Sequence, residues 1–220
     1  MSHHEHADQR QAATDYFEPE GWEQRYAGDA QTWSGHANPR LVELASTLTP
    51  GTALDVGCGE GGDVVWLAQQ GWHATGADFS RNGLARAARH AELAGVADRV
   101  DWWQVDARRF DAQGRTFDLV TSHYLHPPDG GMVEVTRRLA TAVAPGGHLL
   151  VVGHALHSMP GAHDGHDDQR TRAMFAVEDL LPALPADMEV LVAEERPRRL
   201  VREGRAVDVA DVTLAARRRA

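Results

Sequence analysis

The stretch from residue 52 to residue 61 reads Thr52-Ala53-Leu54-Asp55-Val56-Gly57-Cys58-Gly59-Glu60-Gly61. A short aliphatic run that ends in turn residues is typical of a buried parallel strand, and residues 53–56 fit that description. The glycines let the backbone turn tightly and approach a ligand, because they carry no Cβ. Residues 63–68 then form an apolar helical stripe with Asp63 as its predicted N-cap, and Gly71 ends the helix. The sequence therefore predicts a strand, a ligand-binding glycine loop and a helix.

The loop by itself leaves two cofactor classes open. Gly57, Gly59 and Gly62 satisfy the dinucleotide fingerprint G-x-G-x-x-G, which is typical of an NAD-linked oxidoreductase. The longer pattern Asp55-x-Gly57-x-Gly59-x-Gly61 resembles the first motif of the class I S-adenosylmethionine (SAM) methyltransferases.

Three later features agree with the methyltransferase resemblance. Asp78 and Asp106 end the second and third predicted strands, and Pro145-Gly146-Gly147 precedes a strong apolar strand. The oxidoreductase alternative explains neither Asp106 nor the Pro-Gly-Gly turn. A third possibility is a noncatalytic SAM-binding module that acts as a sensor or a partner subunit.

The resemblance covers roughly residues 15 to 215 and implies a Rossmann-like, doubly wound α/β sheet. Seven strands with helices on both faces are expected, and the last strand is expected to be antiparallel. The predicted order of strands and helices, with two strands at the end, agrees with this class. We expect residues 1–14 to be a disordered tail and residues 15–220 to be one methyltransferase domain. Within that domain, residues 15–50 are predicted to form an N-terminal lid and helix, and residues 51–220 the Rossmann-like core.

Composition argues against a nucleic-acid partner, and the family resemblance implies a small-molecule methyl acceptor. All 22 basic residues are arginine, and the formal net charge is −10. An acidic body disfavours nucleic-acid binding, which depends on a basic face.

No run of about 18 apolar residues is present, so we expect a cytoplasmic protein without a membrane span. We expect it to be a monomer or a homodimer. Cys58 is the only cysteine, which excludes an internal disulfide.

Aromatic residues precede the first strand. Trp22, Tyr26 and Trp33 lie in a polar stretch between Tyr16 and Gly35. This spacing is similar to the N-terminal lid of the thiopurine and tellurite type of methyltransferase, which implies closure over cofactor and acceptor. The alternative is that the rings only cover the sheet edge.

Ligands of open α/β sheets bind beyond the carboxyl ends of the strands, so one crevice is expected to collect the polar residues found there. Asp78 is placed to accept hydrogen bonds from two ribose hydroxyls. The resemblance implies that Asp106 accepts from the adenine amine, that Ala107 donates to the ring, that Phe79 lies against it, and that Asp55 anchors the loop. The predicted cofactor-binding residues are Trp33, Asp55, Gly57, Cys58, Gly59, Gly61, Asp78, Phe79, Asp106, Ala107 and Ser122.

Methyl transfer from a sulfonium depends mainly on alignment and exclusion of water. A base is needed only for an acceptor that must lose a proton, and histidine is suited to that role near neutral pH. The predicted catalytic residues are His123, His126 and His154, with His157 as a further candidate. These histidines, together with His163, His166 and Asp167, also raise the alternative of a metal site, but no metal is predicted.

Overall fold

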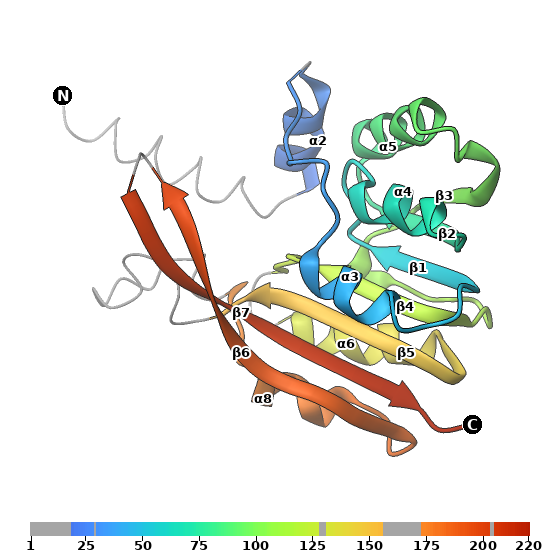
Figure 1. Ribbon diagram of the computed structural model, residues 1–220, viewed down its shortest axis with the longest axis vertical. Helices are drawn as coiled ribbons and strands as arrows, with labels where there is room; N and C mark the ends of the chain where they lie inside the picture. The colour runs from blue at the N-terminus through green and yellow to red at the C-terminus, as the bar shows by residue number, and fades with distance from the viewer. Residues whose placement is uncertain (1–18, 29, 128–130, 156–172, 203–204) are drawn as a thin grey trace.

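The computed structural model describes residues 19–28, 30–127, 131–155, 173–202 and 205–220. They contain a seven-stranded sheet in the order β3-β2-β1-β4-β5-β7-β6 (Figure 1). Its strands are β1 Thr52–Val56, β2 His73–Asp78, β3 Val100–Gln104, β4 Phe117–His123, β5 Val143–His154, β6 Met188–Arg202 and β7 Arg205–Arg218. Strands β1 to β5 pair in parallel, whereas β7 is antiparallel to both β5 and β6. The predicted sheet is confirmed; the predicted tail, residues 1–14, lies outside the described residues.

Helices cover both faces of the sheet (Figure 1). They are α2 Pro19–Ala27, α3 Pro39–Ala45, α4 Gly62–Gln69, α5 Arg81–Leu93, α6 Met132–Thr141 and α8 Val177–Leu180, with short 3₁₀ turns η1 Ala97–Arg99, η2 Ala107–Arg109 and η4 Leu181–Ala183. On one face, Leu41 of α3 and Leu67 of α4 pack in one apolar cluster. On the other face, Leu139 of α6 and Leu180 of α8 pack in a second cluster. The helices on the two faces hold in place the strand ends at which the site lies.

Besides Asp63, the sequence predicts Asn38, Ser80 and Asp129 as helix caps, because each directly precedes an apolar helical stripe. The caps at Asn38 and Ser80 are confirmed, and Asp129 lies outside the described residues. The Asn38 side chain accepts a hydrogen bond from the Arg40 N–H at 2.9 Å, and the Ser80 hydroxyl accepts one from the Gly83 N–H at 2.9 Å. The prediction for Asp63 was wrong, because α4 is capped by Gly61 in the left-handed conformation with φ 78°. Asp63 lies in the first turn of α4, and its carboxylate is free for contacts described below.

The C-terminal hairpin is longer than predicted. The sequence predicts the two final strands over residues 188–194 and 206–215, whereas β6 and β7 pair from Met188↔Arg218 to Arg202↔Arg205. Strand β5 pairs with β7 only as far as His154↔Asp211, so the rest of the hairpin extends past the carboxyl end of β5 (Figure 1). Residues 211–216 are all buried. In the sequence, Val207 and Val209 alternate on one face of this strand and Val212 and Leu214 on the other, which a bulge or two covered faces could explain. The burial of residues 211–216 shows that both faces are covered there.

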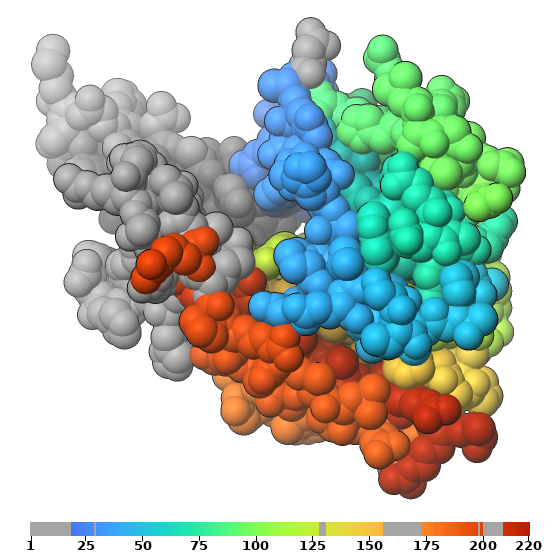
Figure 2. Space-filling model, viewed as in Figure 1, coloured from blue at the N-terminus to red at the C-terminus, as the bar shows by residue number. Residues whose placement is uncertain are grey.

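The N-terminal helix α2 lies beside α5, which Figure 2 shows as blue atoms against green ones. In the described part of the chain, no helix has the length and apolar character needed to cross a membrane.

Candidate active site

The glycine loop joins β1 to α4 at the carboxyl edge of the sheet. Gly57, Gly59 and Gly61 all have positive φ values, of 83°, 52° and 78°. A Cβ on Gly61 would lie 2.7 Å from the Ala87 Cβ, so only glycine fits between the loop and α5. The N–H of Gly57 donates to the Ala77 carbonyl of β2 at 2.7 Å. These contacts hold the loop tightly over the ends of β1 and β2.

Asp78, at the end of β2, is the buried carboxylate of this edge. Its Oδ2 accepts from the Gly59 N–H at 2.9 Å, and its Oδ1 accepts from the Ser80 N–H at 2.9 Å. Burial raises the pKa of Asp78, and the two N–H groups act in the opposite sense by stabilising the charged form. A carboxylate has about four lone-pair positions, so acceptor capacity remains for hydroxyl groups of a ligand.

The predicted lid residues lie directly on the glycine loop. The Trp33 indole N–H donates to the Tyr26 hydroxyl at 2.8 Å, and Trp22 stacks on both rings. A Cβ added to Gly59 would lie 2.7 Å from the Tyr26 hydroxyl and 3.3 Å from the Trp33 nitrogen. Two aromatic residues from the N-terminal segment therefore contact the backbone that the sequence assigns to cofactor binding.

Two carboxylates anchor this segment to the core. Glu23 of α2 accepts hydrogen bonds from the Ser80 hydroxyl and the Asn82 N–H at the start of α5. Glu60, inside the glycine loop, accepts from the Trp33 N–H at 3.0 Å and pairs with Arg86 of α5. Glu23 and Glu60 were not predicted, because nothing in the local pattern distinguishes them from solvated acids.

The remaining predicted cofactor residues divide into two groups. Asp106 and Phe79 lie at the surface edge, where the Asp106 carboxylate pairs with Arg108 at 2.7 Å. Burial acts to raise the pKa of Asp106, but the Arg108 hydrogen bonds outweigh it and hold the pKa below its usual range. Ser122 is fully buried and donates to the Val56 carbonyl at 2.8 Å. Burial raises the pKa of the Cys58 thiol. Ser122 and Cys58 thus contact the interior side of the loop.

A buried charge cluster lies beneath the loop. The Nδ1 atom of His123, at the end of β4, is 2.7 Å from Oδ2 of Asp63 and 4.0 Å from Oδ1 of Asp55. Asp55 also accepts from the Thr121 hydroxyl at 2.8 Å, and Asp63 accepts from the Asn38 N–H at 2.6 Å. The cluster therefore links β1, α4, β4 and the first residue before α3.

The protonation of this cluster follows from its burial. Burial, followed by the negative charge of Asp63, raises the pKa of Asp55. Burial acts to lower the pKa of His123, but the neighbouring carboxylates of Asp63 and Asp55 raise it overall. For Asp63, burial is outweighed by the His123 charge, and the pKa lies below its usual range. His123 and Asp63 therefore form a buried ion pair. Of the two carboxyl groups, that of Asp55 is protonated more readily than that of Asp63.

Asp55, Asp63 and His123 are also the group of potential metal ligands found among the described residues, with ligand atoms within 4.8 Å of one another. Two ligands of one ion at about 2.0–2.2 Å are usually more than 3 Å apart. The 2.7 Å between His123 and Asp63 is instead the length of a charged hydrogen bond. His157, His163, His166 and Asp167 lie outside the described residues.

The other two candidate histidines form a stack at the ends of β4 and β5. The rings of His126 and His154 lie 5.2 Å apart with an interplanar angle of 7°, and the Phe175 ring lies 5.8 Å from that of His126. The Nδ1 of His126 lies 3.2 Å from the Ala173 carbonyl. Burial, and then the positive charge of His154, lowers the pKa of His126 to about 4. His126 is consequently neutral at pH 7.

Tyr124 and Asp211 complete the second group and were not predicted. The Tyr124 hydroxyl donates to Oδ2 of Asp211 at 3.0 Å, and Nδ1 of His154 lies 3.5 Å from Oδ1 of the same carboxylate. Their pairing requires β7 to lie beside β5, which residue spacing along the chain does not reveal.

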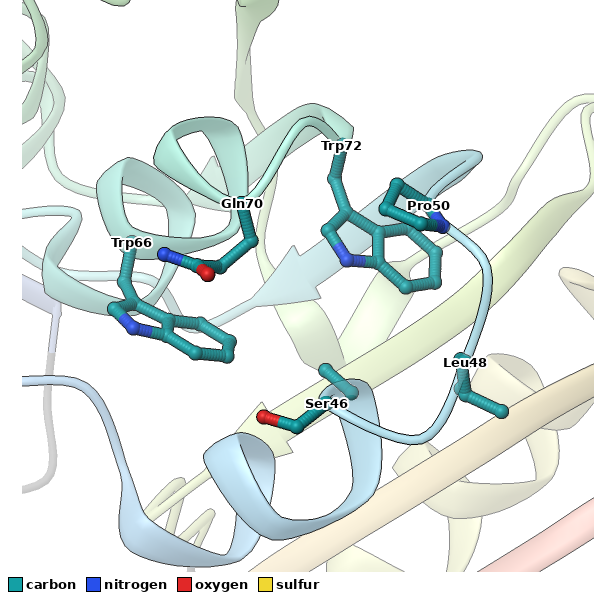
Figure 3. A pocket seen from close by; sticks show the side chains of 7 residues that line it. Ser46, Leu48, Pro50, Trp66, Gln70 and Trp72 are labelled. Carbon is teal, nitrogen blue, oxygen red and sulfur yellow. The ribbon is translucent and has the colours of Figure 1, made fainter.

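A pocket between α3 and α4 lies elsewhere (Figure 3). Its lining includes Ser46, Pro50, Trp66 and Trp72. Pro50 and Trp72 precede β1 and β2, so the pocket is at the amino edge of the sheet, opposite the glycine loop. It does not belong to the candidate site.

Comparisons with known proteins agree with this geometry. Residues 53–147 match the family model described as a methyltransferase domain. The chain is 36% identical over 115 residues to the methyltransferase GfsG of Streptomyces halstedii, covering 51% of this chain and 41% of GfsG. It is 28% identical over 188 residues to thiocyanate methyltransferase 1 of Brassica oleracea, covering 80% of this chain and 77% of the relative. The chain spans less than half the length of the first curated relatives that it matches.

The fold has close solved counterparts. The N-methyltransferase NodS of Bradyrhizobium japonicum, in complex with S-adenosylhomocysteine, superimposes with a TM-score of 0.63 at 19% identity, covering 90% of this chain and 97% of NodS. The sheet order, the glycine loop and the acidic strand ends are those of a Rossmann-like fold that is shared with solved SAM-dependent methyltransferases. Residues 53–147 of the chain match the methyltransferase-domain family.

Proposed function

We propose that this protein transfers a methyl group from SAM to a small-molecule acceptor and releases S-adenosylhomocysteine. The observation that carries the proposal is the Asp78 carboxylate, bound by the Gly59 and Ser80 amides beside a glycine loop with Tyr26 and Trp33 over it. A buried carboxylate next to a glycine loop suits a ribose and the amino-acid end of SAM. Bound SAM would supply an electrophilic methyl group.

In this proposal, different residues bind different parts of SAM. Asp78 accepts from the ribose hydroxyls, Asp106 and the Ala107 N–H meet the adenine, and Phe79 lies along its ring. For Asp106 this requires sharing its carboxylate with Arg108, which pairs with it at 2.7 Å. Gly57 and Gly59 face the methionine part, and Trp33 closes the site from the lid.

A small acceptor is supported by two observations. The lid segment contacts the loop backbone, which encloses the site, and the chain carries a formal net charge of −10, which disfavours a polyanionic nucleic acid. The similarity to thiocyanate methyltransferase 1 extends over most of both chains. We further propose a cytoplasmic monomer or homodimer.

The test has two parts. Calorimetric titration with SAM and S-adenosylhomocysteine measures binding to the glycine loop. Purified protein is then incubated with SAM and a panel of thiols, phenols, amines and metalloid anions, and release of S-adenosylhomocysteine is measured. Tight binding without release for any acceptor would favour the noncatalytic SAM-binding module, and absence of binding would refute the proposal.

A further inference from the structure

A histidine–carboxylate pair lies at the carboxyl ends of β4 and β5. His154 is the last residue of β5, and Asp211 is its cross-strand partner on β7. The Nδ1 of His154 lies 3.5 Å from Oδ1 of Asp211, whose side chain is only 6% exposed. This contact directs Nδ1 of His154 toward a buried negative charge. Among the described residues no group bonds to the Nε2 atom, so this atom is available to a ligand, and the His154 side chain is 31% exposed.

Tyr124 holds the same carboxylate from the β4 side. Its hydroxyl donates to Oδ2 of Asp211 at 3.0 Å, and its ring lies 4.6 Å from that of His154. Tyr124 has a φ of 53°, a value found elsewhere among the described non-glycine residues only at Gln113. Such a backbone conformation is unfavourable for a bulky side chain and is concentrated at functional sites. Tyr124 directly follows the end of β4, and β4 is the neighbour in the sheet of β1, the strand that leads into the glycine loop.

The other two histidines are buried and differ in how their ring nitrogens are bonded; Nε2 of His123 has no hydrogen-bond partner among the described residues. Nδ1 of His123 is paired with Asp63 at 2.7 Å, and its Nε2 is buried. For His126, Nδ1 faces the Ala173 carbonyl, and Nε2 faces the His154 N–H at 3.5 Å. His154 is therefore the candidate whose second nitrogen can reach a ligand.

We propose that His154 and Asp211 form a catalytic dyad, oriented by Tyr124, that removes a proton from the methyl acceptor. This inference rests on the proposed methyl transfer. As the acceptor heteroatom bonds to the methyl carbon, its proton passes to Nε2 of His154, and the C–S bond of SAM breaks with both electrons remaining on sulfur. Asp211 stabilises the resulting imidazolium, and the proton then leaves to solvent from the exposed edge of His154.

The dyad defines the acceptor class. A base is useful for a hydroxyl or a weakly acidic thiol, which must lose a proton during transfer, and is superfluous for an acceptor that is already an anion. Within the part of the chain that the structure describes, the titratable groups that contact His154 are His126, Tyr124 and Asp211. Among them only Asp211 carries a negative charge suited to stabilising an imidazolium. The acceptor is thus assigned to protic nucleophiles, with phenols as the probe.

The first test does not require turnover. ¹⁵N NMR of the full chain, at a pH above about 8 where free histidine is neutral, reports which ring nitrogen of His154 carries the proton. The dyad requires the proton on Nδ1, facing Asp211, and an unprotonated Nε2. Asp211→Asn should shift His154 toward the Nε2–H form, whereas Asp101→Asn, which alters the exposed His73–Asp101 pair, should leave His154 unchanged. An Nε2–H tautomer of His154 in the wild type would overturn the dyad.

The second test uses a series of phenols of graded acidity. His154→Gln should reduce turnover by about 10²- to 10⁴-fold for the least acidic phenols and progressively less for the more acidic ones, with SAM affinity unchanged. Asp211→Asn should follow the same trend, and His73→Gln should match the wild type. Equal rates for His154→Gln and wild type across the whole series would overturn the proposal. Absence of SAM binding to the wild type would instead refute the proposed function itself, so calorimetry distinguishes the two failures.

Discussion

Nδ1 of His123 lies 2.7 Å from Oδ2 of Asp63 in the interior beneath the glycine loop. The second oxygen of the same carboxylate accepts from the Asn38 N–H at 2.6 Å. One side chain in the first turn of α4 therefore connects the end of β4 to the end of the lid segment. Because the glycine loop leads directly into this turn, the position of the loop depends on a buried ion pair.

Replacing His123 should destabilise the fold more than it impairs chemistry. His123→Ala leaves Asp63 and Asp55 buried without their cation, and loss of one partner of a buried pair typically costs about 3–5 kcal/mol of unfolding free energy. Chemical denaturation measures this loss, with His73→Ala at the surface as the control. A large fall in turnover with unchanged stability would assign the base role to His123 instead.

The carboxyl group of Asp55 should make stability depend on pH. Its pKa is raised from the ordinary value, first by burial and then by Asp63, to about 7. Between about pH 4, where an unfolded aspartate titrates, and the raised value, the folded chain binds the proton more tightly. The contribution of Asp55 is thus present at low pH and is lost as the pH rises.

His126 acts in the opposite sense, because its pKa of about 4 lies below that of an unfolded histidine. The measurement is therefore the difference in unfolding free energy between wild type and Asp55→Asn, which still contains His126. This difference should shift against the wild type as the pH rises from about 4 to about 7, and then level off. If the difference in unfolding free energy stayed constant over this pH range, or shifted in favour of the wild type, Asp55 would be ionised throughout the range.

Removal of the Asp78 charge should weaken SAM binding. Hydrogen bonds to a charged group contribute about 1.5–3 kcal/mol, so Asp78→Asn should reduce affinity roughly tenfold or more. Asparagine is preferable to alanine, because it keeps one acceptor for the Gly59 and Ser80 amides. Asp101→Asn is the surface control. Unchanged calorimetric affinity in a folded Asp78→Asn protein would falsify the ribose assignment.

The lid should loosen when its core anchor is removed. Glu60→Ala takes away the acceptor of the Thr32 and Trp33 N–H groups and the partner of Arg86. Trypsin cleavage after Arg25 in α2 should accelerate severalfold, and saturating S-adenosylhomocysteine should slow cleavage of the wild type. Glu43→Ala, which alters an exposed pair with Arg40, should cleave like the wild type. Cleavage that is insensitive to both Glu60 and ligand would mean that the aromatic residues only cover the sheet edge.

Several features of the site could be predicted because their causes are local. Gly59 and Gly61 stand where the backbone has positive φ, and Ser80 caps the helix three residues ahead of its partner amide. Asp78 follows its strand directly. These properties depend on a few consecutive residues. The alternation of strands and helices agreed with a doubly wound sheet, whereas the antiparallel last strand was expected only from the family resemblance.

The contacts of polar side chains could not be predicted in the same way. Asp63 has the sequence context of a helix cap, but its carboxylate bonds to His123, 60 residues away. Tyr124 and Asp211 are separated by 87 residues and meet only because β7 enters the sheet next to β5.

The sequence by itself determined the strand, the glycine loop and the acidic strand ends, since steric limits on φ and short-range hydrogen bonds act within a few residues. The tertiary structure alone decided which histidine is buried in an ion pair and which is partly exposed beside Asp211. His123 and His154 both end central strands, and each is followed by another histidine three residues later along the chain. They differ because strand order places Asp63 against His123 and Asp211 beside His154. Burial then determines how strongly each carboxylate interacts with its histidine.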